Sequence, residues 1–147
     1  MFNFSLNSGR VVGKKEDLKE KLKRELLLEE EITSEQLERI KRFIRLTNKG
    51  QVVFVVPREK LPLRDQILLY LLGKKLAQEA GLADKDSASI EEVGNGLGVD
   101  YFQVAARLSD LKTQHYVLAA ERGEYIVILE RLNEILDRLE KLIQEKV

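Results

Sequence analysis

The apolar positions of the first sixty residues follow two different periods. Near the start, Phe2, Phe4 and Leu6 alternate with polar residues, and a turn signal at residues 7–9 precedes two valines, which predicts a short hairpin; the alternative is a frayed chain end. Between residues 14 and 31 the period becomes helical, because leucines recur at positions 18, 22 and 26 with Lys and Glu between them.

A second helix and a strand are predicted between residues 33 and 56. Thr33 or Ser34 can cap the helix, and basic residues up to Arg45 fall in its last turn. Its expected buried stripe consists of Leu37, Ile40, Phe43 and Ile44. After the turn signal at residues 48–50, the uncharged segment 51–56 (Gln-Val-Val-Phe-Val-Val) has the strongest strand signal in the chain.

From residue 63 onward the pattern predicts helices, a hairpin and a last helix. A long helix is expected over residues 63–80, closed by Gly81. Ser89 and Asp100 are placed to cap two shorter helices, the second with Val104, Leu108 and Leu111 on its inner face. Residues 116–120, 121–124 and 125–128 then predict strand, turn and strand.

The apolar residues near the C-terminus are spaced by three and four in alternation. They are Leu129, Leu132, Leu136, Leu139 and Ile143, called here the heptad seam. This spacing is that of a coiled-coil interface about two heptads long, so we expect these residues to form a homodimer. The alternative is an amphipathic helix that packs on its own domain.

Composition narrows the class of protein. Of 147 residues, 44% are hydrophobic and 34% are charged, which excludes a disordered chain and a membrane protein. The absence of Cys excludes disulfides, thiolate metal sites and cysteine nucleophiles, and the single His excludes a multi-histidine metal site. No secretory signal is visible at the start of the sequence. We therefore expect a cytoplasmic protein with no metal, no cofactor, no catalytic residue and no membrane contact.

The stretch from Pro62 to Ile128 resembles the winged helix-turn-helix superfamily of DNA-binding domains. Residues 92–99 are similar to the family's second helix and turn, with Gly94 as the small residue between helices and Gly98 as the turn glycine. Residues 104–111 look like its recognition helix, and residues 116–128 look like its wing. His115 departs from the glycine usual there, although His is enriched in the left-handed conformation that a helix end requires.

The resemblance implies that the recognition helix enters the major groove while the wing contacts the backbone or minor groove. With the inner face fixed, helical geometry predicts that Gln103, Arg107, Asp110 and Gln114 point outward, flanked by Phe102 and Ala106. Gln103 and Arg107 are suited to read adenine and guanine. The expected DNA-binding residues are Tyr101, Gln103, Arg107, Lys112, Gln114 and Arg122.

Local charge complicates this assignment. The formal net charge of zero divides into +4 for residues 1–61, −3 for residues 62–128 and −1 for residues 129–147. The segment that resembles a DNA reader is therefore acidic, whereas contacts with phosphate need basic residues. Basic residues of the N-terminal segment (Lys19, Lys21, Lys23, Arg24, Arg39, Lys41, Arg42 and Arg45) are either a solvated surface or the missing phosphate contacts.

The sequence thus predicts a mostly helical α+β protein in three parts. Residues 1–61 form an N-terminal α/β extension, residues 62–128 a winged helix-turn-helix, and residues 129–147 a C-terminal dimerisation helix. We expect a small, non-enzymatic, sequence-specific protein that binds double-stranded DNA as a homodimer, of the kind that regulates transcription in prokaryotes. The alternative is a winged-helix protein–protein interaction module whose acidic face docks a partner.

Overall fold

The computed structural model describes residues 18–22 and 32–145. The chain divides into two units, residues 1–31 and residues 32–147. In the first unit, residues 18–22 are helical, with the side chains of Leu18 and Leu22 exposed. The hairpin expected near residues 2–12 lies outside the described residues, as does most of the helix expected over residues 14–31.

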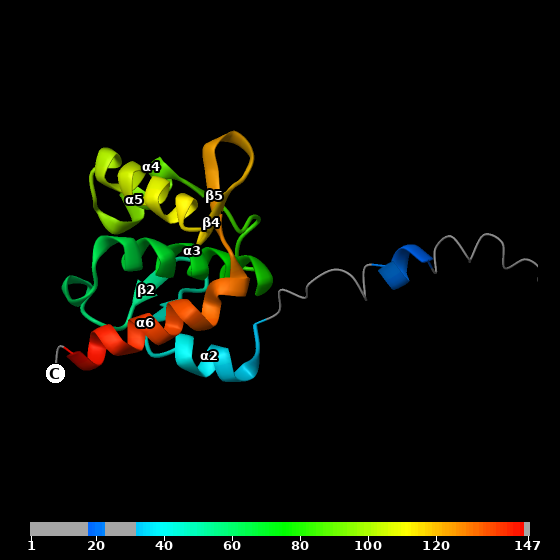
Figure 1. Ribbon diagram of the computed structural model, residues 1–147, viewed down its shortest axis with the longest axis horizontal. Helices are drawn as coiled ribbons and strands as arrows, with labels where there is room; N and C mark the ends of the chain where they lie inside the picture. The colour runs from blue at the N-terminus through cyan, green and yellow to red at the C-terminus, as the bar shows by residue number, and fades with distance from the viewer. Residues whose placement is uncertain (1–17, 23–31, 146–147) are drawn as a thin grey trace, which may run out of the picture. The chain divides into compact units, whose positions relative to one another are not determined.

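The second unit is an α+β structure that is mostly helical (Figure 1). Its helices and strands, in chain order, are α2 (Ser34–Ile40), β1 (Ile44–Leu46), β2 (Val52–Phe54), α3 (Leu63–Glu79), β3 (Ala88–Ser89), α4 (Ile90–Leu97), α5 (Tyr101–Thr113), β4 (Val117–Ala119), β5 (Glu124–Val127) and α6 (Leu132–Glu145). Short 3₁₀ turns occur at Arg58–Lys60, Glu121–Gly123 and Leu129–Arg131.

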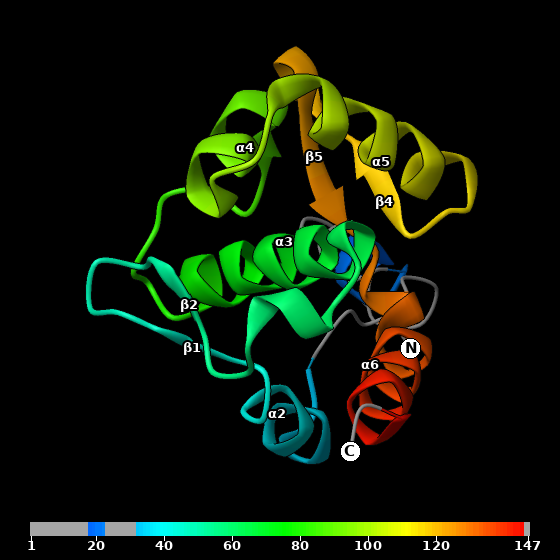
Figure 2. The same ribbon diagram turned by 90° about the vertical axis from the view of Figure 1, so that its left-hand side faces the viewer.

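Helix α3 is the central element of this unit. Figures 1 and 2 show α4 and α5 on one side of α3, and α2, α6 and the β1–β2 hairpin on the other. Ile67 and Leu71 lie on one face of α3 and Leu69 on the opposite face, and all three are fully buried. Helix α3 is therefore covered on both sides. One hydrophobic core therefore includes residues of α2, α3, α5 and α6 together.

The helix expected to run from Thr33 or Ser34 to Arg45 is shorter than predicted. Thr33 caps it in a reciprocal capping box with Gln36, as the sequence suggested, but the helix ends at Ile40. Ile44–Leu46 is instead strand β1, paired antiparallel with β2 so that Ile44 lies opposite Phe54. The expected stripe is correct for Ile40, Phe43 and Ile44, which are buried, and wrong for Leu37, which is 43% exposed. The physical reason is that the backbone N–H and C=O groups of β2 need hydrogen-bond partners. The turn at Asn48–Lys49 brings residues 44–46 alongside β2, where they provide these partners.

The helices from residue 63 onward and the hairpin follow the sequence predictions closely. Ser89 accepts a hydrogen bond from the backbone N–H of Glu92 and caps α4. Strands β4 and β5 form the predicted hairpin, and the short β3 pairs with the other edge of β5, which gives a three-stranded antiparallel sheet of order β3–β5–β4. Residues 32–61 belong to the same compact unit as this sheet.

Candidate functional site

Helix α5 is held at both ends by the local sequence. At its start, the Asp100 carboxylate accepts hydrogen bonds from the backbone N–H groups of Phe102 (3.0 Å) and Gln103 (3.3 Å). At its end, His115 adopts the left-handed conformation with φ = 65°, as expected from the sequence. The three predicted inner residues, Val104, Leu108 and Leu111, are fully buried.

The turn between α4 and α5 depends on two glycines. Gly98 has φ = 68°, the left-handed conformation predicted for the turn. A Cβ at Gly94 would lie 2.9 Å from the carbonyl oxygen of Val99, so only a glycine permits this close approach. The angle between the two helices is therefore fixed by residues that carry no side chain.

The outermost surface of α5 differs from the prediction. With Val104, Leu108 and Leu111 inward, a helix of 3.6 residues per turn places a set of four uncharged residues on the opposite side. These residues, called here the outer line, are Phe102, Ala106, Ser109 and Thr113, and all four are exposed.

The four residues expected to point outward are all exposed but lie to one side of the outer line, and two of them, Gln103 and Gln114, lie toward α3. Gln114 accepts a hydrogen bond from the guanidinium of Arg64 on α3 (3.4 Å). Gln103 lines a groove of about 820 Å³ that β2 and α3 also border. Arg107 and Asp110 form an ion pair with each other (3.2 Å). Of the predicted base-reading pair, Arg107 is thus partnered within its own helix.

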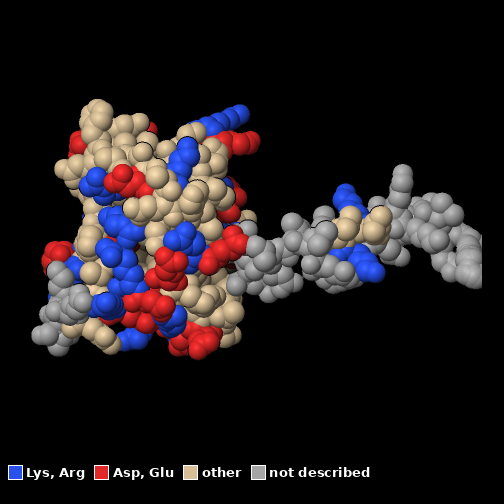
Figure 3. Space-filling view, viewed as in Figure 1, with Lys and Arg blue, Asp and Glu red and all other residues tan. Residues whose placement is uncertain are grey.

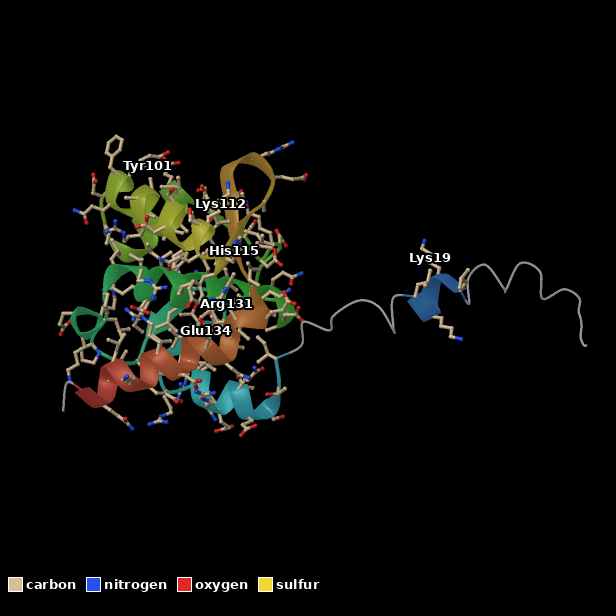
Figure 4. All side chains as sticks on the ribbon, viewed as in Figure 1. Lys19, Tyr101, Lys112, His115, Arg131 and Glu134 are labelled. Carbon is tan, nitrogen blue, oxygen red and sulfur yellow. The ribbon has the colours of Figure 1, made fainter. Side chains whose placement is uncertain are left out.

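The first residues of α5 form an exposed aromatic pair. The rings of Tyr101 and Phe102 lie edge to face, with their centroids 5.4 Å apart. Tyr101 is 49% exposed and Phe102 76% exposed. Figure 4 shows Tyr101 at the end of the second unit that lies opposite α6. Aromatic rings this exposed contribute little to the core, and their exposure indicates a role in binding at the surface.

The tip of the β4–β5 hairpin carries one basic residue in an unusual backbone conformation. Arg122 has φ = 59° and Gly123 has φ = 74°, and both are exposed. The neighbouring Glu124 is paired with Lys85 and accepts a hydrogen bond from the Ser87 hydroxyl. These two contacts, with Lys85 the stronger cause, hold the pKa of Glu124 below its ordinary value. The carboxylate of Glu124 is therefore directed toward Lys85, whereas Arg122 projects from the tip.

A stack of charged and aromatic groups fixes the C-terminal end of α5. The Tyr116 ring lies between the guanidinium groups of Arg64 (5.1 Å to the ring centroid) and Arg131 (4.1 Å). Its hydroxyl donates a hydrogen bond to Glu134 (2.6 Å), and Arg131 donates to the Gln114 carbonyl oxygen (3.1 Å).

This stack reaches α6. Figure 4 shows Arg131 and Glu134 together at the start of α6, on the same side of the molecule as His115 and Lys112. Hydrogen bonds from Arg131 and then from Tyr116 lower the pKa of Glu134. The end of α5 is thereby tied to both α3 and α6.

Charge is distributed unevenly over this unit. In Figure 3, basic and acidic side chains lie side by side over α6, whereas the surface over α4 and α5 is largely uncharged. On α5, Lys112 is exposed and makes no ion pair with any residue of the described ranges. Lys112 and Arg122 are thus the cations of this region that are free to meet a partner.

The basic residues of α2 and β1 lie on the far side of α3 from α5 (Figure 2). Arg39 is also engaged there, because its guanidinium bonds to both Glu140 (2.9 Å) and Asp137 (2.6 Å) on α6. We therefore expect Arg39, Lys41, Arg42 and Arg45 not to reach a ligand that docks on α5. The basic residues at positions 23 and 24 lie outside the described residues.

The heptad seam is covered by its own chain. Leu132, Leu136 and Leu139 are at most 1% exposed, Leu129 is 8% exposed, and Ile143 packs against the same core. These five side chains need no second chain to remove them from water. A homodimer thus stays a prediction, and the heptad seam is not available as its interface because it packs in the chain's own core.

The described residues contain neither a cluster that could hold a metal ion nor a helix that could span a membrane. In residues 18–22 and 32–145, no group of three or more His, Asp or Glu side chains is arranged to hold a metal ion. Within the same ranges, the helices are too short or too polar to cross a membrane.

The sequence prediction placed Phe102 only beside the outward-facing residues of α5, and it did not include Ser109 and Thr113 among them. The signal was present, since the inner residues Val104, Leu108 and Leu111 were identified correctly, and the direction opposite to them follows from 100° per residue.

Comparisons of the chain with protein-family models, with curated proteins and with solved structures found no match.

Proposed function

We propose that this chain is a sequence-specific DNA-binding protein built on a winged helix-turn-helix, with α5 as the recognition helix and the β4–β5 hairpin as the wing. The observation that carries the proposal is the placement of an exposed helix face beside a hairpin whose tip presents Arg122. The order α3, β3, α4, α5, β4, β5 and the sheet order β3–β5–β4 support it. The proposed role is that of a cytoplasmic transcriptional regulator without catalytic activity or cofactor.

The net charge of −3 for residues 62–128 works against DNA binding and is not reduced by ion pairs within the segment. Glu124 pairs with Lys85, Glu92 with Lys74, and Asp110 with Arg107. Each pair places a carboxylate beside a cation, which weakens the local repulsion of phosphate but also occupies that cation. Few cations remain free to release counterions, so we expect weak binding that is readily detected only at low salt.

A homodimer would raise the affinity by placing two recognition helices on one duplex. Two-fold symmetry would match half-sites about 34 Å apart in a pseudo-palindrome. Because the heptad seam is buried, we expect such a dimer to use a different surface. Light scattering at tens of micromolar protein measures this directly, and a monomer under those conditions contradicts the dimer.

The experiment that tests DNA binding is a titration of the protein into labelled duplex, random and genomic, at low and at higher salt. We expect micromolar binding that weakens as salt rises. Lys112→Ala and Arg122→Ala should each weaken binding to all duplexes alike and reduce the salt slope by about 1. Gln103→Ala should relax the sequence preference.

Lys141→Ala is the matched control, because Lys141 is an exposed lysine on α6, away from α5. It should leave both the affinity and the salt slope unchanged. Absence of binding at micromolar protein, or binding that salt does not affect, contradicts the proposed function.

A second candidate function is a protein–protein interaction module on the same fold. The observation that favours it is the exposed aromatic pair of Tyr101 and Phe102, since aromatic residues are enriched at protein interfaces. Acidic groups such as Asp100 lie close by and would suit a basic partner. The salt titration separates the two candidates, because this module would bind no duplex.

A further inference from the structure

The outer line of α5 lacks the groups that read guanine. Its residues are Phe102, Ala106, Ser109 and Thr113, none of them charged and none with a side-chain amide. The nearest guanidinium, Arg107, lies beside the outer line and is paired with Asp110 at 3.2 Å. In the free protein this exposed pair directs the guanidinium toward Asp110, within the same helix.

The N-terminal half of α5 presents apolar groups instead. Phe102 and Ala106 are four residues apart, so their side chains lie next to each other along the helix. Both are exposed, and the Phe102 ring is 76% exposed. In the major groove, the one apolar group on a base edge is the C5 methyl of thymine, and Phe and Ala are among the side chains that contact it.

Gln103 adds a second, polar preference of the same kind. Its side chain is exposed at the first turn of α5, beside Phe102, and forms no side-chain hydrogen bond with any residue in the described part of the chain. A glutamine amide can bind the N6 and N7 atoms of adenine. Gln103 and Phe102 therefore both favour A·T pairs, at different positions, because adjacent residues of a helix point about 100° apart.

We propose that Phe102 and Ala106 are specificity-determining residues that contact thymine methyl groups, so that the sites bound beneath the N-terminal half of α5 consist of A·T pairs. This inference rests on the proposed DNA-binding function. It differs from a general preference for A·T-rich DNA, because it assigns the discrimination to single methyl groups in the major groove.

The experiment uses the full chain and a duplex selected from a random library at low salt. Each thymine of that duplex is replaced in turn by uracil, which pairs identically but lacks the C5 methyl. At one or two positions the replacement should weaken binding about fourfold, as expected for one buried methyl-sized group. At the other positions it should change nothing.

Phe102→Ala tests the residue assignment. The side chain lies in solvent, so the variant should fold normally, bind the thymine duplex less tightly and lose the fourfold ratio at one position. Leu37→Ala is the matched control, because Leu37 is 43% exposed on α2, on the other side of α3 from α5, and this variant should keep the full ratio.

The outcomes separate this inference from the function on which it rests. Salt-dependent binding with equal affinity for thymine and uracil duplexes overturns the methyl contacts and leaves DNA binding standing. A Phe102→Ala variant that retains the full ratio overturns the assignment to Phe102. Absence of binding to any duplex overturns both proposals.

Discussion

Arg138 on α6 and Asp65 on α3 form a two-point ion pair. The Arg138 Nε donates to Asp65 Oδ1 at 2.9 Å and Nη2 donates to Oδ2 at 3.1 Å. The Asp65 side chain is only 1% exposed, whereas that of Arg138 is 45% exposed. The pair therefore fastens α6 to the first turn of α3 from the solvent side.

Removing Arg138 should destabilise the fold, because it leaves a buried carboxylate with only the longer contact to Arg64 (3.4 Å). We expect Arg138→Ala to lower the free energy of unfolding by about 2 kcal/mol, less than for a fully buried pair because Arg138 is half exposed. Denaturant unfolding measures this change. Asp65→Asn combined with Arg138→Ala should recover part of the loss, and a double variant as unstable as the sum of the single variants would contradict the pairing.

Gly73 allows α3 to approach β2 closely. A Cβ at Gly73 would lie 2.4 Å from Val52 Cγ2, although alanine has the higher helix propensity. We expect Gly73→Ala to lower the free energy of unfolding by about 1–2 kcal/mol through overpacking. The same change in a Val52→Ala background should be neutral or stabilising, and a Gly73→Ala variant more stable than the parent chain would show that the contact is not tight.

The left-handed conformation of His115 should allow stabilisation by glycine. His115 has φ = 65° and an exposed side chain, so His115→Gly removes strain without removing buried contacts. We expect the free energy of unfolding to rise by about 0.5–1 kcal/mol. His115→Val should lower it, because a β-branched residue tolerates this conformation poorly. Thermal unfolding of the three chains checks the order.

The contact between α2 and α6 should weaken in acid. Hydrogen bonds from Arg39, the largest cause, hold the pKa of Glu140 below its ordinary value of 4.5. A carboxylate whose pKa is lowered by folding stabilises the folded state above its ordinary pKa, and this contribution is lost as the pH falls through the lower, folded value. Glu140→Gln should therefore lose less stability than the parent chain between pH 5 and pH 3.

Chemical denaturation at the two pH values measures this difference, and Arg39→Gln provides the partner variant. If Arg39 is the main cause, both variants should show a smaller dependence on pH than the parent chain. An unchanged dependence in Glu140→Gln would contradict the assignment to this carboxylate.

The buried heptad seam makes a prediction about concentration. Leu139 is fully buried in the chain's own core, so Leu139→Ala should lower the free energy of unfolding by about 3 kcal/mol. If the heptad seam packs only in this core, the unfolding midpoint of the parent chain should be the same at roughly 1 μM and at roughly 50 μM protein. A midpoint that rises with concentration, and does so only while Leu139 is present, would identify the seam as an interface.

The sequence predicted the segments whose structure is set by local chemistry. The caps at Ser89 and Asp100 and the turn at Gly98 depend on neighbouring residues and were predicted correctly, and Thr33 is one of the two caps predicted for α2. The left-handed end at His115 is of the same kind. Such features follow from backbone dihedral preferences and nearby hydrogen bonds, which a single sequence contains.

Features that depend on distant partners were less predictable. Ile44 fits a helical stripe as well as a strand, and its pairing with Phe54 decided the outcome. Likewise, the spacing of Leu132 and Leu136 shows an apolar face but not whether that face meets another chain or its own core. The outer line of α5 could have been derived in full, because only the direction opposite to Val104 was needed.

The bond between Arg39 and Glu140 joins residues that are 101 positions apart. During synthesis at roughly 5–20 residues per second, α2 therefore waits about 5–20 s for the helix that covers it. In that interval the apolar side of α2, with Ile40, has no α6 to pack against. A nascent chain stalled before residue 132 should thus bind a chaperone that a chain extended past residue 145 no longer binds. Completion of the core therefore requires that α6 has been synthesised.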